Sequence, residues 1–222
     1  MQLPGYLAVG QPVSGHAQDL ALPVGQRVRL IPRVGGELGI DGAIVVAVDN
    51  GGDQRLDEYS PWVNAEYGGG EGDAYVQFIA ETLKPYIDEN FRTLPGAEYT
   101  ALIGSSMGGL ISTYGALEQA DTFGKIGAFS PSYWFALEDL NRYVAGSTAD
   151  LSDTRIYFVA SANESASMAS NVYAMQTALE AKGLEPGNSV VKIDSYGGHN
   201  EAYWRGEFAA AYQWLFDDVE LG

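Results

Sequence analysis

The chain has 222 residues, of which 46% are hydrophobic and 18% charged, so it is long enough to bury the core of one domain over residues 1–222. Its 29 acidic and 12 basic residues give a formal net charge of -17, which excludes nucleic acid and anionic membrane lipid as partners over most of the surface. The absence of cysteine excludes disulfides, thiolate metal sites and a cysteine nucleophile.

The predicted elements alternate between strands and helices from residue 43 onward. Residues 5–39 carry seven glycines and show no clear strand or helix period, so residues 1–42 form an atypical N-terminal segment. Residues 43–48, AIVVAV, form a continuous apolar run that is typical of a strand buried on both faces. Apolar side chains recur at helical spacing over residues 73–90, where Pro85 is expected to kink the helix or end its regular part.

The later elements follow the same alternation. In chain order we expect strands at 101–103, 126–129, 155–160 and 190–196, and helices at 107–120, 133–144, 167–182 and 201–216. Such an order predicts an α/β fold, with a mostly parallel sheet covered by helices on both faces.

A nucleophilic serine is predicted between the strand at 101–103 and the helix that follows it. Gly104, Ser106 and Gly108 form the pattern G-x-S-x-G at this point. A serine on a strand-to-helix turn adopts a strained backbone conformation, so small residues are needed two positions before and after it. The backbone N–H of Met107, at the start of the helix, is expected to face the oxyanion that forms during ester cleavage.

Ser106, Glu164 and His199 each follow a predicted strand, and the carboxyl ends of parallel strands are where ligands gather. Their order along the chain, serine, acid and histidine, is that of the α/β-hydrolase fold. Histidine can take the serine proton, and a carboxylate can orient the imidazole and stabilise its charged form. Asp153 and Asp194 are the rival acids, but one precedes its strand and the other lies within one.

No metal or cofactor is expected. The two histidines, His16 and His199, are far apart, and the sequence has neither a His-Glu-x-x-His motif nor an acidic calcium loop. No apolar run approaches the ~20 residues that span a bilayer, and the first residues show no export signal. We therefore expect a soluble, cytoplasmic protein.

Four segments resemble the Putative esterase family of α/β-hydrolases, which includes esterase D, enterochelin esterase, feruloyl and acetylxylan esterases and bacterial mycolyltransferases. These segments are GSSMGGL (104–110), FGKIGAFSPSYW (123–134), YFVASANES (157–165) and GGHNEAYWR (197–205). The resemblance implies Ser106 as nucleophile, His199 as base and Glu164 as acid. It also implies that Trp134, and a loop containing Arg55 and Tyr59, border the acyl or alcohol pocket.

The N-terminal region departs from this family. Members usually begin with several strands and a segment resembling HDGQN, which gives the second oxyanion donor, whereas only about forty residues precede the strand at 43–48. We therefore expect a fold shortened at its N-terminal edge. Removal of edge strands would expose apolar surface on residues 43–48, which suggests a homodimer.

The predicted function is that of a serine carboxylesterase, which hydrolyses short-chain acyl esters through an acyl-enzyme intermediate and acts on a small-molecule or glycan ester. One alternative is an acyltransferase, in which a sugar or alcohol replaces water. Another is a catalytically degenerate hydrolase-like domain that binds a glycan or another protein.

Overall fold

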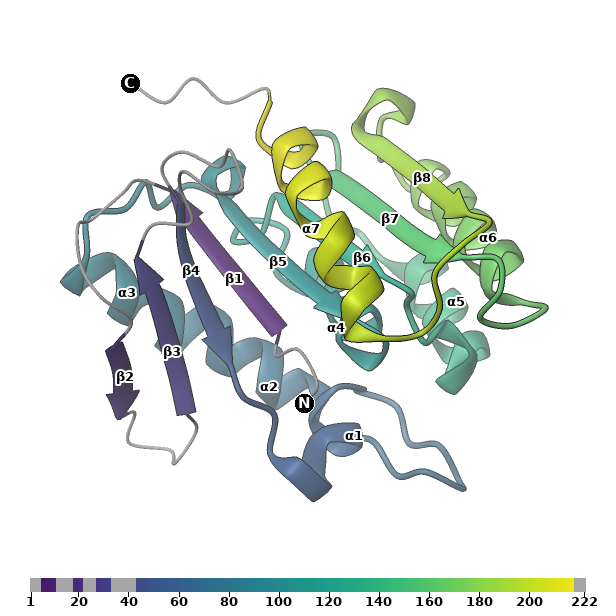
Figure 1. Ribbon diagram of the computed structural model, residues 1–222, viewed down its shortest axis with the longest axis horizontal. Helices are drawn as coiled ribbons and strands as arrows, with labels where there is room; N and C mark the ends of the chain where they lie inside the picture. The colour runs from purple at the N-terminus through teal and green to yellow at the C-terminus, as the bar shows by residue number, and fades with distance from the viewer. Residues whose placement is uncertain (1–4, 11–17, 22–26, 33–42, 218–222) are drawn as a thin grey trace.

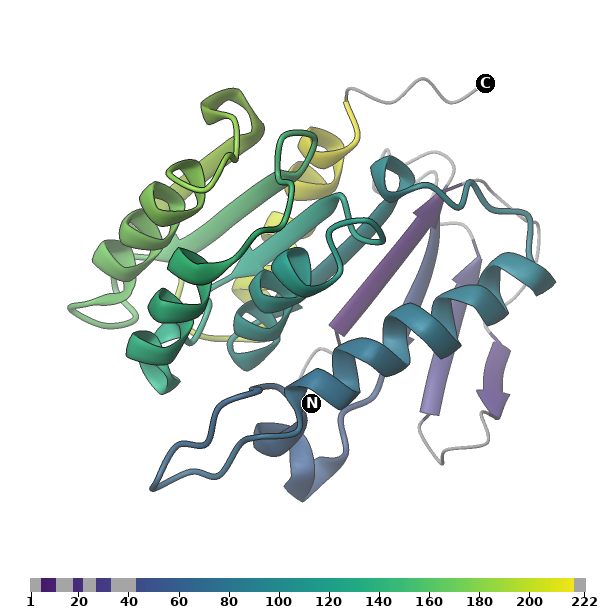
Figure 2. The ribbon, with the colours of Figure 1, turned by 180° about the vertical axis from the view of Figure 1, so that it is seen from behind.

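The computed structural model describes residues 5–10, 18–21, 27–32 and 43–217, which form one eight-stranded sheet flanked by helices (Figure 1 and Figure 2). The strands are β1 (Gly5–Gly10), β2 (Gln18–Ala21), β3 (Arg27–Pro32), β4 (Ala43–Val48), β5 (Thr100–Ser105), β6 (Lys125–Phe129), β7 (Arg155–Ser161) and β8 (Ser189–Asp194). The helices are α1 (Arg55–Glu58), α2 (Gly72–Phe78), α3 (Lys84–Asn90), α4 (Met107–Glu118), α5 (Leu137–Gly146), α6 (Met168–Glu180) and α7 (Glu201–Leu215).

The strands lie in the order β2-β3-β4-β1-β5-β6-β7-β8 across the sheet. Neighbours from β5 to β8 are parallel, while β1 lies between β4 and β5 and is antiparallel to both. Among the described strands, only β1 and β3 run against the other six. The α/β fold with a mostly parallel sheet is therefore confirmed.

The N-terminal region differs from the sequence-based expectation. Strands β1, β2 and β3 lie within residues 5–39, where no strand was expected, and β3 and β2 continue the sheet beyond β4. The expectation of a shortened edge is therefore wrong. The sequence did not indicate these strands because each has only four to six residues, too few to show a clear period. Residues 43–48 are at most 6% exposed, so the reason for expecting a homodimer does not hold.

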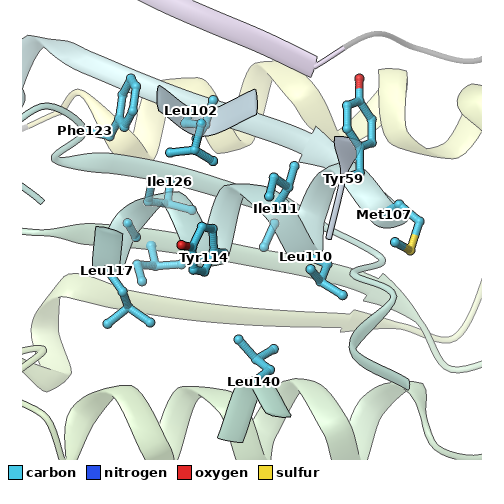
Figure 3. Close-up of a cluster of buried hydrophobic side chains, with 14 of the residues drawn as sticks. Tyr59, Leu102, Met107, Leu110, Ile111, Tyr114, Leu117, Phe123, Ile126 and Leu140 are labelled. Atoms are coloured by element: carbon cyan, nitrogen blue, oxygen red, sulfur yellow. The ribbon is translucent and has the colours of Figure 1, made fainter. Parts of the chain in front are cut away.

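The two faces of the sheet are covered unequally (Figure 1 and Figure 2). Helix α7 lies on one face, over β6 and β7, and helices α2 to α6 lie on the opposite face, while α1 lies beyond the end of the strands. Successive strand residues point to opposite faces, so Leu102 lies in the same buried cluster as Leu110 of α4 (Figure 3), whereas Ile103 belongs to the cluster under α7. Burial on both sides explains why these strands are apolar throughout.

The helical segment over residues 72–90 is divided by a π-helical turn at Ile79–Leu83, between α2 and α3. Pro85 is the second residue after this turn. Proline has no N–H, and its ring collides with the carbonyl four residues earlier in a regular α-helix, so a wider turn lets the chain pass it. The sequence predicts a kink or an end of the regular helix at Pro85; in the structure the irregular turn precedes the proline, and helix α3 continues through it to Asn90. No helix in the described ranges has the length and apolar character needed to cross a membrane.

Candidate active site

Ser106 lies on a sharp turn between β5 and α4. Its φ of 59° and ψ of -121° are a conformation that L-residues other than glycine rarely adopt. The turn is held by its neighbours: the Ser106 N–H donates to the Phe129 carbonyl at 2.8 Å, and the Ser106 carbonyl accepts from the Ser132 N–H at 3.0 Å. The side chain is thereby presented at the carboxyl edge of the sheet.

The two glycines of the serine motif have different roles. A β-carbon on Gly104 would lie 2.8 Å from the Gly108 α-carbon and closer still to the Gly108 carbonyl. A β-carbon on Gly108 would meet nothing within 4 Å. The close approach of the strand to the helix therefore excludes a side chain at Gly104 but not at Gly108.

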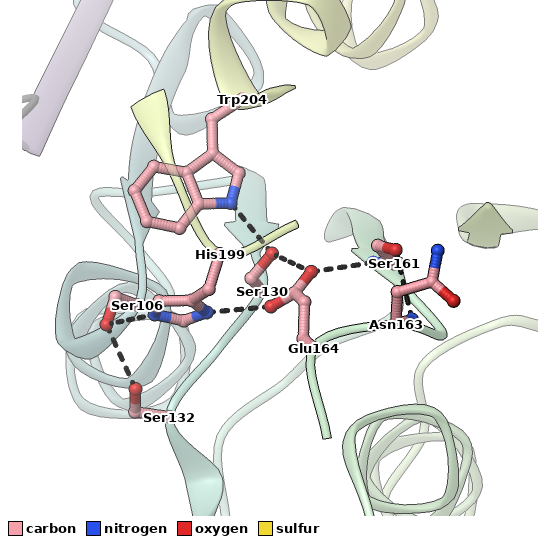
Figure 4. A network of polar contacts seen from close by, with 8 residues as sticks. All are labelled: Ser106, Ser130, Ser132, Ser161, Asn163, Glu164, His199 and Trp204. Atoms are coloured by element: carbon pink, nitrogen blue, oxygen red, sulfur yellow. Dashed lines mark hydrogen bonds and ion pairs between the residues drawn. The ribbon is translucent and has the colours of Figure 1, made fainter. Parts of the chain in front are cut away.

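The structure brings the three predicted residues together in a continuous chain of hydrogen bonds (Figure 4). His199 Nε2 lies 2.8 Å from Ser106 Oγ, and His199 Nδ1 lies 2.7 Å from Glu164 Oε2. An ionised carboxylate can only accept, so the imidazole proton is on Nδ1 and the Nε2 lone pair faces the Ser106 hydroxyl. This arrangement can take a proton from the serine.

The Glu164 side chain is 1% exposed and accepts three hydrogen bonds. Besides His199, the donors are the Ser161 N–H and the Ser130 hydroxyl, each 2.7 Å from Oε1. Burial raises the pKa of the Glu164 carboxyl, but the bonds from His199, Ser161 and Ser130 outweigh it and hold this pKa below its usual value. Glu164 is therefore ionised at neutral pH.

The rival acids lie elsewhere. Asp194 accepts from the Tyr203 hydroxyl at 2.9 Å and pairs with Lys192 at 3.4 Å. Asp153 comes just before β7, at the end of the sheet opposite Ser106.

Three residues that make polar contacts in the site were missed by sequence reasoning. Ser132 Oγ lies 3.1 Å from Ser106 Oγ, and Ser130 Oγ accepts from the Trp204 indole N–H at 2.7 Å. Ser130 and Ser132 directly follow β6, so the strand-end rule that selected the predicted residues could have found them. Trp204 lies inside α7 and carries no such signal.

The loop that carries His199 is fixed by its surroundings. Gly197 has φ 89°, and a β-carbon there would overlap the ring of Tyr203. The Asn200 side chain caps α7 by accepting the Tyr203 N–H at 3.1 Å. Asn163 ties the Glu164 loop to this one, because its side-chain amide donates to the Ser195 carbonyl at 2.8 Å.

The predicted pocket residues differ in exposure. Trp134 is 53% exposed and packs edge-on against Tyr67, with ring centroids 5.7 Å apart. The Arg55 guanidinium lies 5.7 Å from the ring centroid of Tyr59, and burial lowers its pKa against the opposing effects of Tyr59 and Glu201. Tyr59 itself is 2% exposed and stacks on Tyr75 in the core, so it packs the fold instead of lining a pocket.

The family model described as "Putative esterase" matches residues 21–215. The chain belongs to this esterase family. Among curated proteins, it is 28% identical over 177 residues to the uncharacterized protein YbbA of Bacillus subtilis, an alignment that covers 74% of this chain and 70% of YbbA.

Two solved structures of other proteins share the fold of this chain. The enterobactin esterase FES from Shigella flexneri matches with a TM-score of 0.74 and 15% identity, over 96% of this chain and 62% of that one. The siderophore hydrolase EstA from Aspergillus nidulans matches with a TM-score of 0.63 and 16% identity, over 81% of this chain and 73% of that one. This chain thus spans less than two thirds of the length of FES.

Proposed function

We propose that this protein is a serine carboxylesterase that uses Ser106, His199 and Glu164 as a catalytic triad. The observation that carries the proposal is the unbroken run of hydrogen bonds from Glu164 through His199 to the strained Ser106. Membership of an esterase family supports the same reaction class. Only the close positioning of a base makes a serine hydroxyl nucleophilic at neutral pH.

In the acylation step, Ser106 Oγ attacks the ester carbonyl carbon while His199 Nε2 takes the hydroxyl proton. The carbonyl π electrons move to its oxygen, which becomes an oxyanion. Met107 is the first residue of α4, so its N–H has no acceptor within the helix and lies at the positive end of the helix dipole. We assign this N–H as an oxyanion donor.

The tetrahedral intermediate then collapses with cleavage of the bond to the alcohol oxygen, which takes the proton from His199. Water repeats the sequence on the acyl-enzyme: His199 removes its proton, and Ser106 leaves as the restored hydroxyl. Throughout, the ionised and buried Glu164 stabilises the imidazolium and keeps its Nε2 aimed at Ser106.

For the substrate, we propose a small-molecule or glycan ester with a short acyl group. Trp134 supports this class because it follows Ser132, which contacts Ser106, by two residues and is 53% exposed. With Tyr67 against it, Trp134 offers an apolar surface on which a sugar face or an acyl chain can pack.

The proposal is tested by measuring hydrolysis of p-nitrophenyl acetate and butyrate by the wild type and by Ser106→Ala. Ser112→Ala is the matched control, because Ser112 is buried on the same helix outside the site. Turnover and fluorophosphonate labelling of Ser106 should both disappear only in Ser106→Ala. A folded wild type with neither turnover nor label would refute the proposal and favour a binding domain.

A further inference from the structure

We propose that Trp204 and Ser130 form a positioning relay that holds Glu164 in the orientation required by His199. The inference rests on the proposed function, since it concerns how that site is kept in order. Neither residue is assigned a catalytic role, because Ser130 is fully buried and Trp204 is 5% exposed.

The direction of the relay follows from the chemistry of its members (Figure 4). An indole N–H can only donate, so Trp204 Nε1 gives its proton to Ser130 Oγ at 2.7 Å. An ionised carboxylate can only accept, so the Ser130 hydroxyl donates to Glu164 Oε1 at 2.7 Å. Ser130 has one hydroxyl proton, which it gives to Glu164, and the indole N–H occupies one of its two lone pairs, so the two bonds together fix the direction of this hydroxyl.

The relay divides the two carboxylate oxygens between two tasks. Oε1 is held by Ser130 and by the Ser161 N–H, whereas Oε2 bonds to His199 Nδ1. Two donors on one oxygen resist rotation of the carboxylate about its terminal bond, so Oε2 stays directed at the imidazole.

Trp204 also touches the imidazole directly. Its ring meets the His199 ring edge to face, with centroids 4.9 Å apart and an interplanar angle of 86°. One side chain of α7 therefore contacts the base directly and the acid through Ser130. The backbone of Ser130 is held in a left-handed conformation, with φ 44°, by its own N–H bond to the Val159 carbonyl at 2.7 Å.

The relay makes a distinctive kinetic prediction. Loss of the Ser130 hydroxyl should lower kcat about tenfold and leave KM unchanged, because a hydrogen bond to a charged group is lost without a change in substrate contacts. Trp204→Phe keeps an aromatic ring beside His199 but removes the N–H, so it should have a smaller effect of the same kind.

A double-mutant cycle separates a relay from two independent packing roles. If Trp204 acts through Ser130, the double variant should lose no more activity than Ser130→Ala alone. Trp214→Phe is the matched control, because Trp214 lies on the same helix, stacks on Tyr157 and should leave kcat unchanged. Additive losses, or an unchanged kcat in either single variant, would overturn the relay.

A spectroscopic measurement keeps the inference testable if the esterase assay itself fails. The chain has only two histidines, so the proton on His199 Nδ1 can be assigned by comparison with His16→Gln. We expect a strongly downfield resonance in the wild type that moves upfield in Ser130→Ala but not in Trp214→Phe. An unmoved resonance in folded Ser130→Ala would overturn the relay, whereas absent turnover with a normal shift would refute only the proposed function.

Discussion

The paired substitutions Gly104→Ala and Gly108→Ala test whether the close contact between β5 and α4 determines which glycine of the serine turn can carry a side chain. The G-x-S-x-G pattern treats the two glycines alike, but the structure does not. At Gly104 an added β-carbon would lie well within 3.0 Å of the Gly108 carbonyl, a separation that real β-carbons essentially never show. The Gly108 atoms belong to the backbone and the β-carbon has a position fixed by its own backbone, so no side-chain rotation can relieve the contact.

The expected magnitudes follow from this geometry. Gly104→Ala must push β5 and α4 apart by several tenths of an ångström, and overpacking of this kind costs about 1–3 kcal/mol of unfolding free energy. The shift moves Ser106 relative to His199, and a misplacement approaching 1 Å costs about 10²-fold in rate. At Gly108 the space is open and alanine is the better helix former, so a stability gain of up to about 1 kcal/mol is expected.

Urea unfolding followed by tryptophan fluorescence gives the free energies, and the four tryptophans supply the signal. Hydrolysis of p-nitrophenyl acetate, normalised to folded protein, gives the rates. The contact argument would be refuted if Gly104→Ala were as stable as the wild type, or if Gly108→Ala were destabilised by an equal amount.

Three further predictions concern the loops and charges of the site. Gly197→Ala should lower kcat about 10²-fold, because its β-carbon overlaps the Tyr203 ring and displaces the loop of His199; unchanged kinetics would contradict this. Trp134→Ala should raise KM without changing kcat or the urea midpoint, since Trp134 is half exposed; a matching fall in kcat would argue against a binding role. Because the pKa of Glu164 is lower in the folded protein than its ordinary value of 4.5, ionised Glu164 stabilises the fold fully above pH 4.5, and this stabilisation is lost as the pH falls toward the lowered pKa. The difference in unfolding free energy between the wild type and Glu164→Gln, measured by urea unfolding between pH 3 and 6, should therefore shrink as the pH falls. A difference that does not change with pH would refute this prediction.

The core of the fold and three site residues could be predicted from local sequence. The apolar run at 43–48 is strand β4 without change of boundary, and the serine turn lies between β5 and α4 as expected. Because parallel strands end at one edge, the positions of Ser106, Glu164 and His199 after three strands were enough to predict that they meet. In the structure these three side chains do meet, and His199 lies within hydrogen-bond distance of both Ser106 and Glu164.

The N-terminal strands β1, β2 and β3 form through pairing with other strands, which the local sequence pattern does not show. Strand β1 comes from the start of the chain and lies between β4 and β5, and its pairings join residues 33 (Gly10 and Ala43) to 97 (Tyr6 and Ile103) positions apart in the sequence. A six-residue strand such as GYLAVG has too few positions for a clear period, so its partners determine its structure. Strand β3, RVRLIP (27–32), is a second six-residue strand that the local pattern did not predict.

The supporting contacts of the site likewise depend on tertiary structure. Ser130 and Trp204 are 74 residues apart and hydrogen-bond only because α7 packs across β6. Likewise, Tyr59 reads from sequence as a pocket residue, but α1 turns it into the core against Tyr75. Sequence determines which groups reach the catalytic edge, through strand ends and chain order. The tertiary structure decides which neighbouring residues hold these groups in place, because the supporting contacts join residues that are far apart in the sequence and meet only where a helix crosses the sheet.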